Sequence, residues 1–212
     1  MSLVKKVISG TVGKKFLMAL TGLFLVTFLV IHLIGNLQLF YDDGGYAFNT
    51  YSVFMTTNPL IKTVSYVLYA SILAHALVSL LLAMKNYKAR PEKYKVNNPG
   101  ANTAWESRNM GILGTIILIF LVVHMQTFWY TYKFGAPPYA QYEISNTGEI
   151  SKSAIPYSQV TPEIKHQEGV YKDLYAIVVE AFSQWWYVAF YVISMVALAY
   201  HLFHGFSLLF RL

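Results

Sequence analysis

Four long apolar runs dominate the pattern of hydrophobic and polar positions along the chain. A helix of about 20 apolar residues crosses the hydrocarbon core of a bilayer, and each run is long enough to do so. We predict an all-α integral membrane protein, a single transmembrane domain over 1–212, with helices at about 16–40, 60–84, 109–133 and 176–206. The composition, 56% hydrophobic and 12% charged, agrees with this class.

Charge in the connections predicts the orientation of these helices. Basic residues cluster before the first run and between the second and third, whereas the first connection carries Asp42 and Asp43. The positive-inside rule then places the N-terminus in the cytoplasm. The net charge of +6 is better explained by this topology than by nucleic-acid binding, because the basic residues line no single polar face.

The long outer loop at 135–173 has one proline pair, two single prolines and turn-like residues, but no strong helical periodicity. We expect an ordered cap or lid with little regular structure. The absence of cysteine from the sequence excludes disulfides, thiolate-ligated clusters and covalent haem attachment, so histidine must hold any metal cofactor.

Histidines occur in all four apolar runs: His32, His75, His124, and His201 with His204. A single buried histidine is often satisfied by a neighbouring backbone group, but one in each helix favours a shared function. At a rise of about 1.5 Å per residue, His32 and His124 each lie about 23 Å from the inner end of their helices, whereas His75 and His201 fall near the inner side. Two pairs about 15 Å apart fit two stacked haems with bis-histidine ligation. Spacing alone leaves the choice between His201 and His204 open.

Small residues in the same runs are compatible with macrocycles that approach the backbone. Ordinary close helix packing in lipid uses the same residue types, so both interpretations stay open. They are Gly22, Gly35, Ser71, Ala74, Ser79, Gly111, Gly114 and Thr115.

Several separated motifs occur in the order found in one known family. They are the run from His32 to Phe40, the segment from Ala47 to Ser52, the stretch from Trp105 to Met110, Gln184 to Tyr187, and His201 to Gly205. In these motifs the chain resembles the cytochrome b subunit of succinate dehydrogenase and fumarate reductase, in the di-haem, single-anchor form of Bacteroidetes-like bacteria.

The resemblance implies an inner haem b held by His75 and His201, and an outer haem b held by His32 and His124. Depth along the helices gives the same pairing. The resemblance makes His204 a neighbour of the inner haem. Arg108 is a candidate contact of a haem propionate or of the soluble subunits, and a role in topology would account for it equally well. The resemblance also implies a fifth transmembrane helix, whereas the sequence stops at Leu212. Either the sequence is cut short, which we expect, or this member lacks the last helix.

The partners that the resemblance implies are a flavoprotein subunit and an iron–sulfur subunit on the cytoplasmic side of the bacterial inner membrane. The electron acceptor would be a quinone, usually menaquinone, near the outer haem. Glu180 is the only acidic residue inside a predicted span and is the candidate for protonating quinone, although an interfacial carboxylate would look the same. The other candidate quinone contacts are Gln38, Tyr41, Asn49, Trp129 and Tyr130.

We therefore expect the membrane anchor of respiratory complex II, a succinate:quinone oxidoreductase in which the partner holds the succinate site. One alternative is a di-haem anchor of another oxidoreductase, such as a hydrogenase or formate dehydrogenase. Another is a transporter whose membrane histidines relay protons or bind a metal such as zinc.

Overall fold

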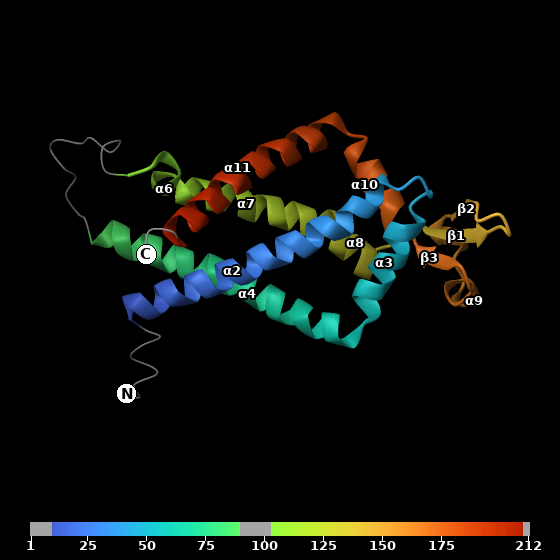
Figure 1. The fold of residues 1–212 in the computed structure, drawn as a ribbon, viewed down its shortest axis with the longest axis horizontal. Coiled ribbons are helices and arrows are strands. Elements are labelled where there is room, and N and C mark those ends of the chain that lie inside the picture. The colour runs from blue at the N-terminus through green and yellow to red at the C-terminus, as the bar shows by residue number, and fades with distance from the viewer. Residues whose placement is uncertain (1–9, 90–102, 210–212) are drawn as a thin grey trace. The chain divides into compact units, whose positions relative to one another are not determined.

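The computed structural model describes residues 10–89 and 103–209, in which long helices predominate (Figure 1). The four main helices are α2 (Thr11–Asn36), α4 (Pro59–Lys88), α7 (Met110–His124) and α11 (Trp185–Leu209). Among the described residues, four segments are long and apolar enough to cross a membrane: Val12–Phe40, Pro59–Lys88, Met110–Phe134 and Trp185–Phe206. The prediction of four membrane-spanning helices is thus confirmed in number and in approximate position.

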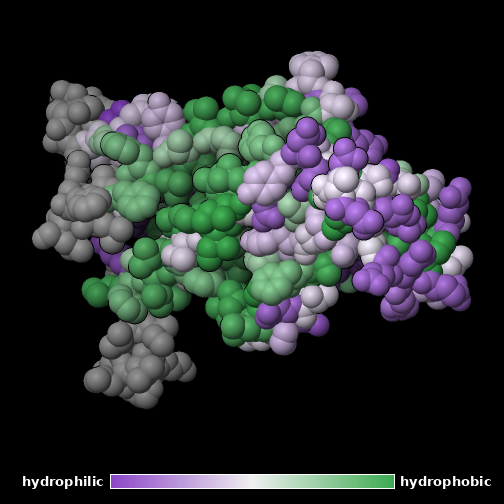
Figure 2. All heavy atoms as spheres, turned by 45° about the vertical axis from the view of Figure 1, so that its right-hand side comes forward, coloured by the Kyte–Doolittle hydropathy of each residue, from purple (hydrophilic) through white to green (hydrophobic). Residues whose placement is uncertain are grey.

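Large apolar side chains on these helices point away from the protein. Leu33, Leu73, Val122 and Ile193 are each at least 60% exposed. Figure 2 shows hydrophobic residues covering the long helices and hydrophilic ones gathered over the small sheet. Water would penalise so large an apolar surface, whereas lipid does not. The chain is a multi-pass membrane protein.

A short helix, α3 (Tyr46–Thr57), lies in the first connection, where we predicted no helix. The Asp43 carboxylate accepts hydrogen bonds from the backbone N–H groups of Gly45 and Ala47, both at 2.8 Å, and so satisfies donors at the start of the helix. Asn58 then ends α3 and starts α4, because its side-chain oxygen accepts from the N–H groups of Leu60 and Ile61.

The outer loop contains a three-stranded antiparallel sheet, so the prediction of little regular structure was wrong. Its strands are β1 (Tyr139–Ile144), β2 (Ile150–Ile155) and β3 (Val170–Lys172), in the order β2-β1-β3. The turn at Ser145–Gly148 that we recognised joins β1 to β2, with Gly148 at φ 84. The one-turn helix α9 (Pro162–Lys165) precedes β3. Buried Tyr139, Ala140 and Tyr142 give the sheet its packed face.

Two predicted spans are interrupted. After His124 the third changes to a π-helical turn, η2 (Met125–Tyr130), before α8 (Thr131–Phe134). The fourth is divided into α10 (Leu174–Phe182) and α11 by a break at Ser183 and Gln184. The candidate membrane span begins at Trp185, and Glu180 lies before it, on the separate helix α10.

The described residues group into two compact units. Of the described residues, the first unit contains 10–28, 66–89, 103–120 and 192–209, and the second contains 29–65 and 121–191. Each unit contains one of the predicted histidine pairs.

Candidate functional site

The first unit brings His75 of α4 and His201 of α11 together. Their ring centroids are 6.2 Å apart and the ring planes are inclined at 60°. A metal–imidazole bond is about 2 Å long and the ring centre lies about 1 Å beyond the nitrogen, so two imidazoles on opposite sides of one metal have centres about 6 Å apart. The separation of His75 and His201 matches this value.

Thr21 of α2 supports the His75 ring. Its hydroxyl donates to the carbonyl oxygen of Leu17 at 2.7 Å, and its Oγ1 lies 3.1 Å from His75 Nδ1. Because the hydroxyl proton is directed to the helix carbonyl, the Thr21 oxygen can accept from a protonated Nδ1. That tautomer leaves the lone pair on Nε2, the nitrogen that would face a metal.

Two glycines lie beside these rings. A Cβ on Gly22 would be 3.4 Å from His75 Cε1, and one on Gly114 would be 4.0 Å from His201 Cε1. Longer side chains at either position would extend along the imidazoles, so the glycines keep space there. Within the described residues, His201 Nδ1 is a buried polar atom without a hydrogen-bond partner.

The other predicted neighbours of the inner pair also lie in the first unit. His204 is half-buried and follows His201 within one turn of α11. Arg108 ends the short helix α6 (Trp105–Arg108), and its guanidinium donates to the carbonyl of Thr103 at 2.5 Å.

The second unit brings His32 of α2 and His124 of α7 together. Their ring centroids are 5.7 Å apart, with the planes nearly perpendicular at 83°. His124 Nδ1 lies 2.8 Å from the hydroxyl oxygen of Tyr191, and the Tyr187 hydroxyl donates to that same oxygen at 3.3 Å. The π-helical turn after His124 places the Phe128 ring 5.3 Å from the imidazole.

The sequence did not single out Thr21, Phe128, Tyr187 or Tyr191. Tyr187 lies in one of the quoted motifs, but its hydroxyl contact depends on a residue one turn later. The pairs themselves are the ones that depth along the helices predicted, and the role of their members as haem ligands stays a prediction.

The candidate quinone contacts lie in the second unit. Gln38 belongs to the 3-10 turn η1 (Leu37–Phe40), and its carbonyl accepts from the N–H of Tyr41, whose side chain is 61% exposed. Trp129 and Tyr130 belong to η2, where both rings pack against Phe134. Glu180 is exposed on α10, which packs against both η2 and α3.

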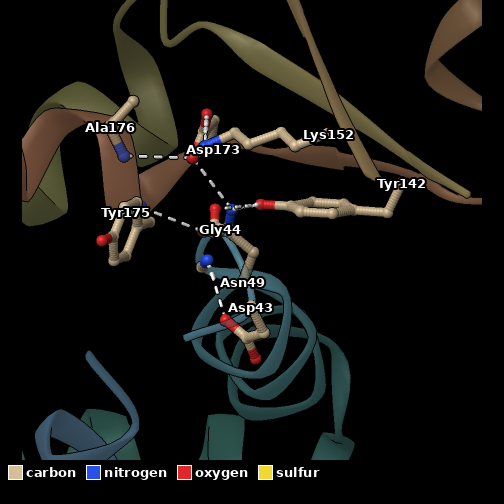
Figure 3. A network of polar contacts seen from close by, with 9 residues as sticks. Asp43, Gly44, Asn49, Tyr142, Lys152, Asp173, Tyr175 and Ala176 are labelled. Atoms are coloured by element: carbon tan, nitrogen blue, oxygen red, sulfur yellow. Dashed lines mark hydrogen bonds and ion pairs between the residues drawn. The ribbon is translucent and has the colours of Figure 1, made fainter. Parts of the chain in front are cut away.

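Asn49 differs from these residues because its side chain is fully buried in a polar network (Figure 3). Its Nδ2 donates to the Tyr142 hydroxyl and to Asp173 Oδ1, both at 2.9 Å. Its Oδ1 accepts from the backbone N–H of Tyr175 at 3.0 Å. The amide therefore has all its hydrogen-bonding groups engaged within the protein.

Asp173 connects that network to the sheet. One carboxylate oxygen also caps α10 by accepting from Ala176 N at 3.0 Å, and the other pairs with Lys152 of β2 at 2.7 Å (Figure 3). Burial, followed by the nearby Asp173 carboxylate, raises the pKa of Tyr142 above its usual range. The Tyr142 hydroxyl stays protonated and donates to the Gly44 carbonyl at 3.2 Å.

In the part of the chain that the structure describes, no three His, Asp or Glu side chains gather as a metal-binding group. Each histidine pair thus offers two protein ligands to a metal, which suits a group that brings its own remaining ligands. Comparison of the chain with models of known protein families, with curated proteins and with solved structures gives no match.

Proposed function

We propose that the chain is the membrane-anchor cytochrome b subunit of a succinate:quinone oxidoreductase, with one haem b at each histidine pair. The observation that carries the proposal is the presence of two separate imidazole pairs, each from two apolar helices, with ring centroids 6.2 Å and 5.7 Å apart. At these separations the two imidazoles of each pair would hold one haem b between them and supply two nitrogen ligands to its iron.

The number of ligands favours haem over a bare metal ion. Zinc in proteins takes three or four protein ligands, whereas each pair offers two. A porphyrin supplies four equatorial nitrogens, so two histidines complete the coordination of its iron. Gly22 and Gly114 leave space beside the inner imidazoles, as a flat macrocycle requires.

A bound haem b would accept and release one electron at a time. The chain's own residues would hold the two groups in fixed orientation. Thr21 fixes the His75 ring through Nδ1, and Tyr191 contacts Nδ1 of His124 in the same way. The electron path would run from the inner pair to the outer pair and then to quinone.

The proposed quinone contacts are Gln38, Tyr41, Trp129 and Tyr130, with Glu180 as the proton-exchanging group. Exposure of Tyr41, Tyr130 and Glu180 is compatible with access by a ligand from the membrane. Asn49 is left out because its amide is engaged by Tyr142, Asp173 and Tyr175. Menaquinone is the proposed quinone.

The proposed partners are a flavoprotein subunit and an iron–sulfur subunit at the cytoplasmic face of a bacterial inner membrane. The basic connection between the second and third spans supports a cytoplasmic position for this side of the chain. Lys85 and Lys88 lie in the last turn of α4 and Arg108 lies at the end of α6, whereas the other basic residues between these helices lie outside the described residues.

A reduced-minus-oxidised visible spectrum of the purified subunit tests the proposal, together with the haem content per chain. We expect b-type bands and two haems, one lost in His32→Ala and the other in His75→Ala. His166→Ala is the matched control, because His166 is exposed in the outer loop and should keep both haems. Absence of haem from the wild-type protein would refute the proposal, and bound zinc in its place would favour a transporter.

A further inference from the structure

We propose that Tyr191 is a positioning residue for the outer haem. Its phenol oxygen accepts a hydrogen bond from Nδ1 of His124, fixes the orientation of that imidazole and lowers the reduction potential of the haem. This inference rests on the proposed function, because it concerns a haem held by His124.

The protonation state of His124 gives the direction of this hydrogen bond. A neutral imidazole carries one proton, and coordination through Nε2 requires that proton to reside on Nδ1. Nδ1 lies 2.8 Å from the Tyr191 oxygen, which then acts as the acceptor. A hydroxyl oxygen has two lone pairs, and the Tyr187 hydroxyl donates to the second one at 3.3 Å.

Packing holds the Tyr191 ring in place independently of its hydroxyl. The ring lies 4.7 Å from Phe182 and 4.8 Å from Tyr187, centroid to centroid. Because Tyr187 is only 3% exposed, its ring is a fixed packing surface for Tyr191. The phenol oxygen of Tyr191 is thereby held in position toward His124. A phenylalanine at position 191 would keep the ring contacts and remove the hydroxyl that contacts His124 and Tyr187.

The hydrogen bond has a defined electronic effect. An acceptor at Nδ1 draws the proton away from the ring and makes Nε2 a stronger electron donor to iron. The stronger donor stabilises the more positive, oxidised iron and so lowers the reduction potential. The inner pair is supported differently, by the Thr21 hydroxyl at His75. Removal of the Tyr191 hydroxyl should therefore raise the potential of the outer haem alone.

The test is a redox titration of Tyr191→Phe in the intact complex, followed by visible absorption and by electron paramagnetic resonance of the ferric haems. We expect two haems per chain, an upward shift of the outer midpoint potential, an altered outer ferric signal and an unchanged inner haem. The titration component missing from His32→Ala identifies the outer haem. Tyr66→Phe is the control, because Tyr66 is a 57% exposed tyrosine of α4, and it should shift neither potential.

A second variant covers the case in which Tyr191→Phe assembles no outer haem. Tyr187→Phe keeps the Tyr191 acceptor and removes a competing donor, so it should strengthen the bond from His124 and shift the outer potential downward. An outer potential unchanged in Tyr191→Phe, or in Tyr187→Phe where Tyr191→Phe does not assemble, would overturn the role of Tyr191. Absence of haem b from the wild-type protein would instead refute the proposed function.

Discussion

Replacement of Asn49 by alanine should loosen the outer sheet from α3 and α10. Asn49 is fully buried, and its amide joins Tyr142 of β1, Asp173 and the backbone of Tyr175. Alanine removes all three hydrogen bonds at once. The substitution should therefore act on the stability of the second unit.

The magnitude follows from the partners that are left behind. A neutral buried hydrogen bond contributes about 1 kcal/mol and one to a charged group about 1.5–3 kcal/mol, which gives a loss of about 4 kcal/mol for the set. Asp173 keeps its bonds to Ala176 and Lys152, and Tyr142 keeps its bond to Gly44. Water that enters the space left by the amide would reduce the loss to about 2 kcal/mol.

Hydrogen–deuterium exchange in detergent micelles measures this change locally. Suitable reporters are the amides of Tyr142 and Asp173, which donate to Gly169 and Pro138. A loss of about 2–4 kcal/mol corresponds to exchange that is roughly 30- to 700-fold faster, if opening of the sheet governs exchange.

Thr50→Ala is the matched control on the same helix. The Thr50 hydroxyl bonds only to carbonyls of its own helix, those of Tyr46 and Ala47, so its loss should cost less than about 1 kcal/mol. An Asn49→Ala protein that exchanges no faster than Thr50→Ala would refute the network as a stabilising element. A raised KM for quinone without faster exchange would favour the quinone contact that the sequence suggested.

Three further substitutions or conditions test the sites. His201→Ala should lose the inner haem and His204→Ala should keep it, as measured by haem content, and the reverse result would reassign the ligand. Gly22→Val should lower inner haem content more than Gly22→Ala. The Cβ of alanine would make only an ordinary contact with His75 at 3.4 Å, whereas the additional methyl groups of valine would extend beyond it. Equal haem content in both variants would contradict this. The pKa of Tyr142 is raised, so its contribution to stability is complete below the ordinary pKa of about 10 and is lost as pH rises above it. Hydrogen–deuterium exchange of the β1 amides should therefore accelerate as pH rises over that alkaline range. The acceleration should be less steep in Tyr142→Phe than in the wild-type protein.

The membrane helices could be predicted because their signal is local and strong. A run of apolar residues fixes the length of a span, and the rise per residue then fixes the depth of each side chain. Depth paired the second helix with the fourth and the first with the third, and the resemblance favoured His201 over His204. The structure brings together His75 with His201 and His32 with His124.

The interruptions of the helices carried no comparable signal. The fourth run breaks at Ser183 and Gln184, where neither proline nor glycine occurs, and the Ser183 hydroxyl turns back to the carbonyl of Glu180 at 2.7 Å. Serine makes such bonds inside helices as well as at their ends, so its presence does not predict a break. For the same reason Glu180 seemed to lie within a span.

The sheet and α3 depend on contacts between distant segments. The hairpin turn of β1 and β2 was visible in the sequence, but β1 also pairs with β3 beyond a long insertion. Asn49 and Asp173, which connect α3 to the start of α10, lie 124 residues apart. No periodic pattern within one segment predicts contacts of this range.

The same limit explains why the supporting hydroxyls were missed although the histidines were found. A histidine in an apolar helix is conspicuous, whereas a threonine there commonly bonds the carbonyl four residues earlier. Thr21, Thr27 and Thr115 all do so, to Leu17, Leu23 and Gly111. Of these three, Thr21 also contacts a histidine, His75, which lies 54 residues away in the sequence. Tyr191, the residue that contacts His124, lies 67 residues from it. The sequence therefore predicts which residue type can support an imidazole, and helix packing selects the individual residue that does.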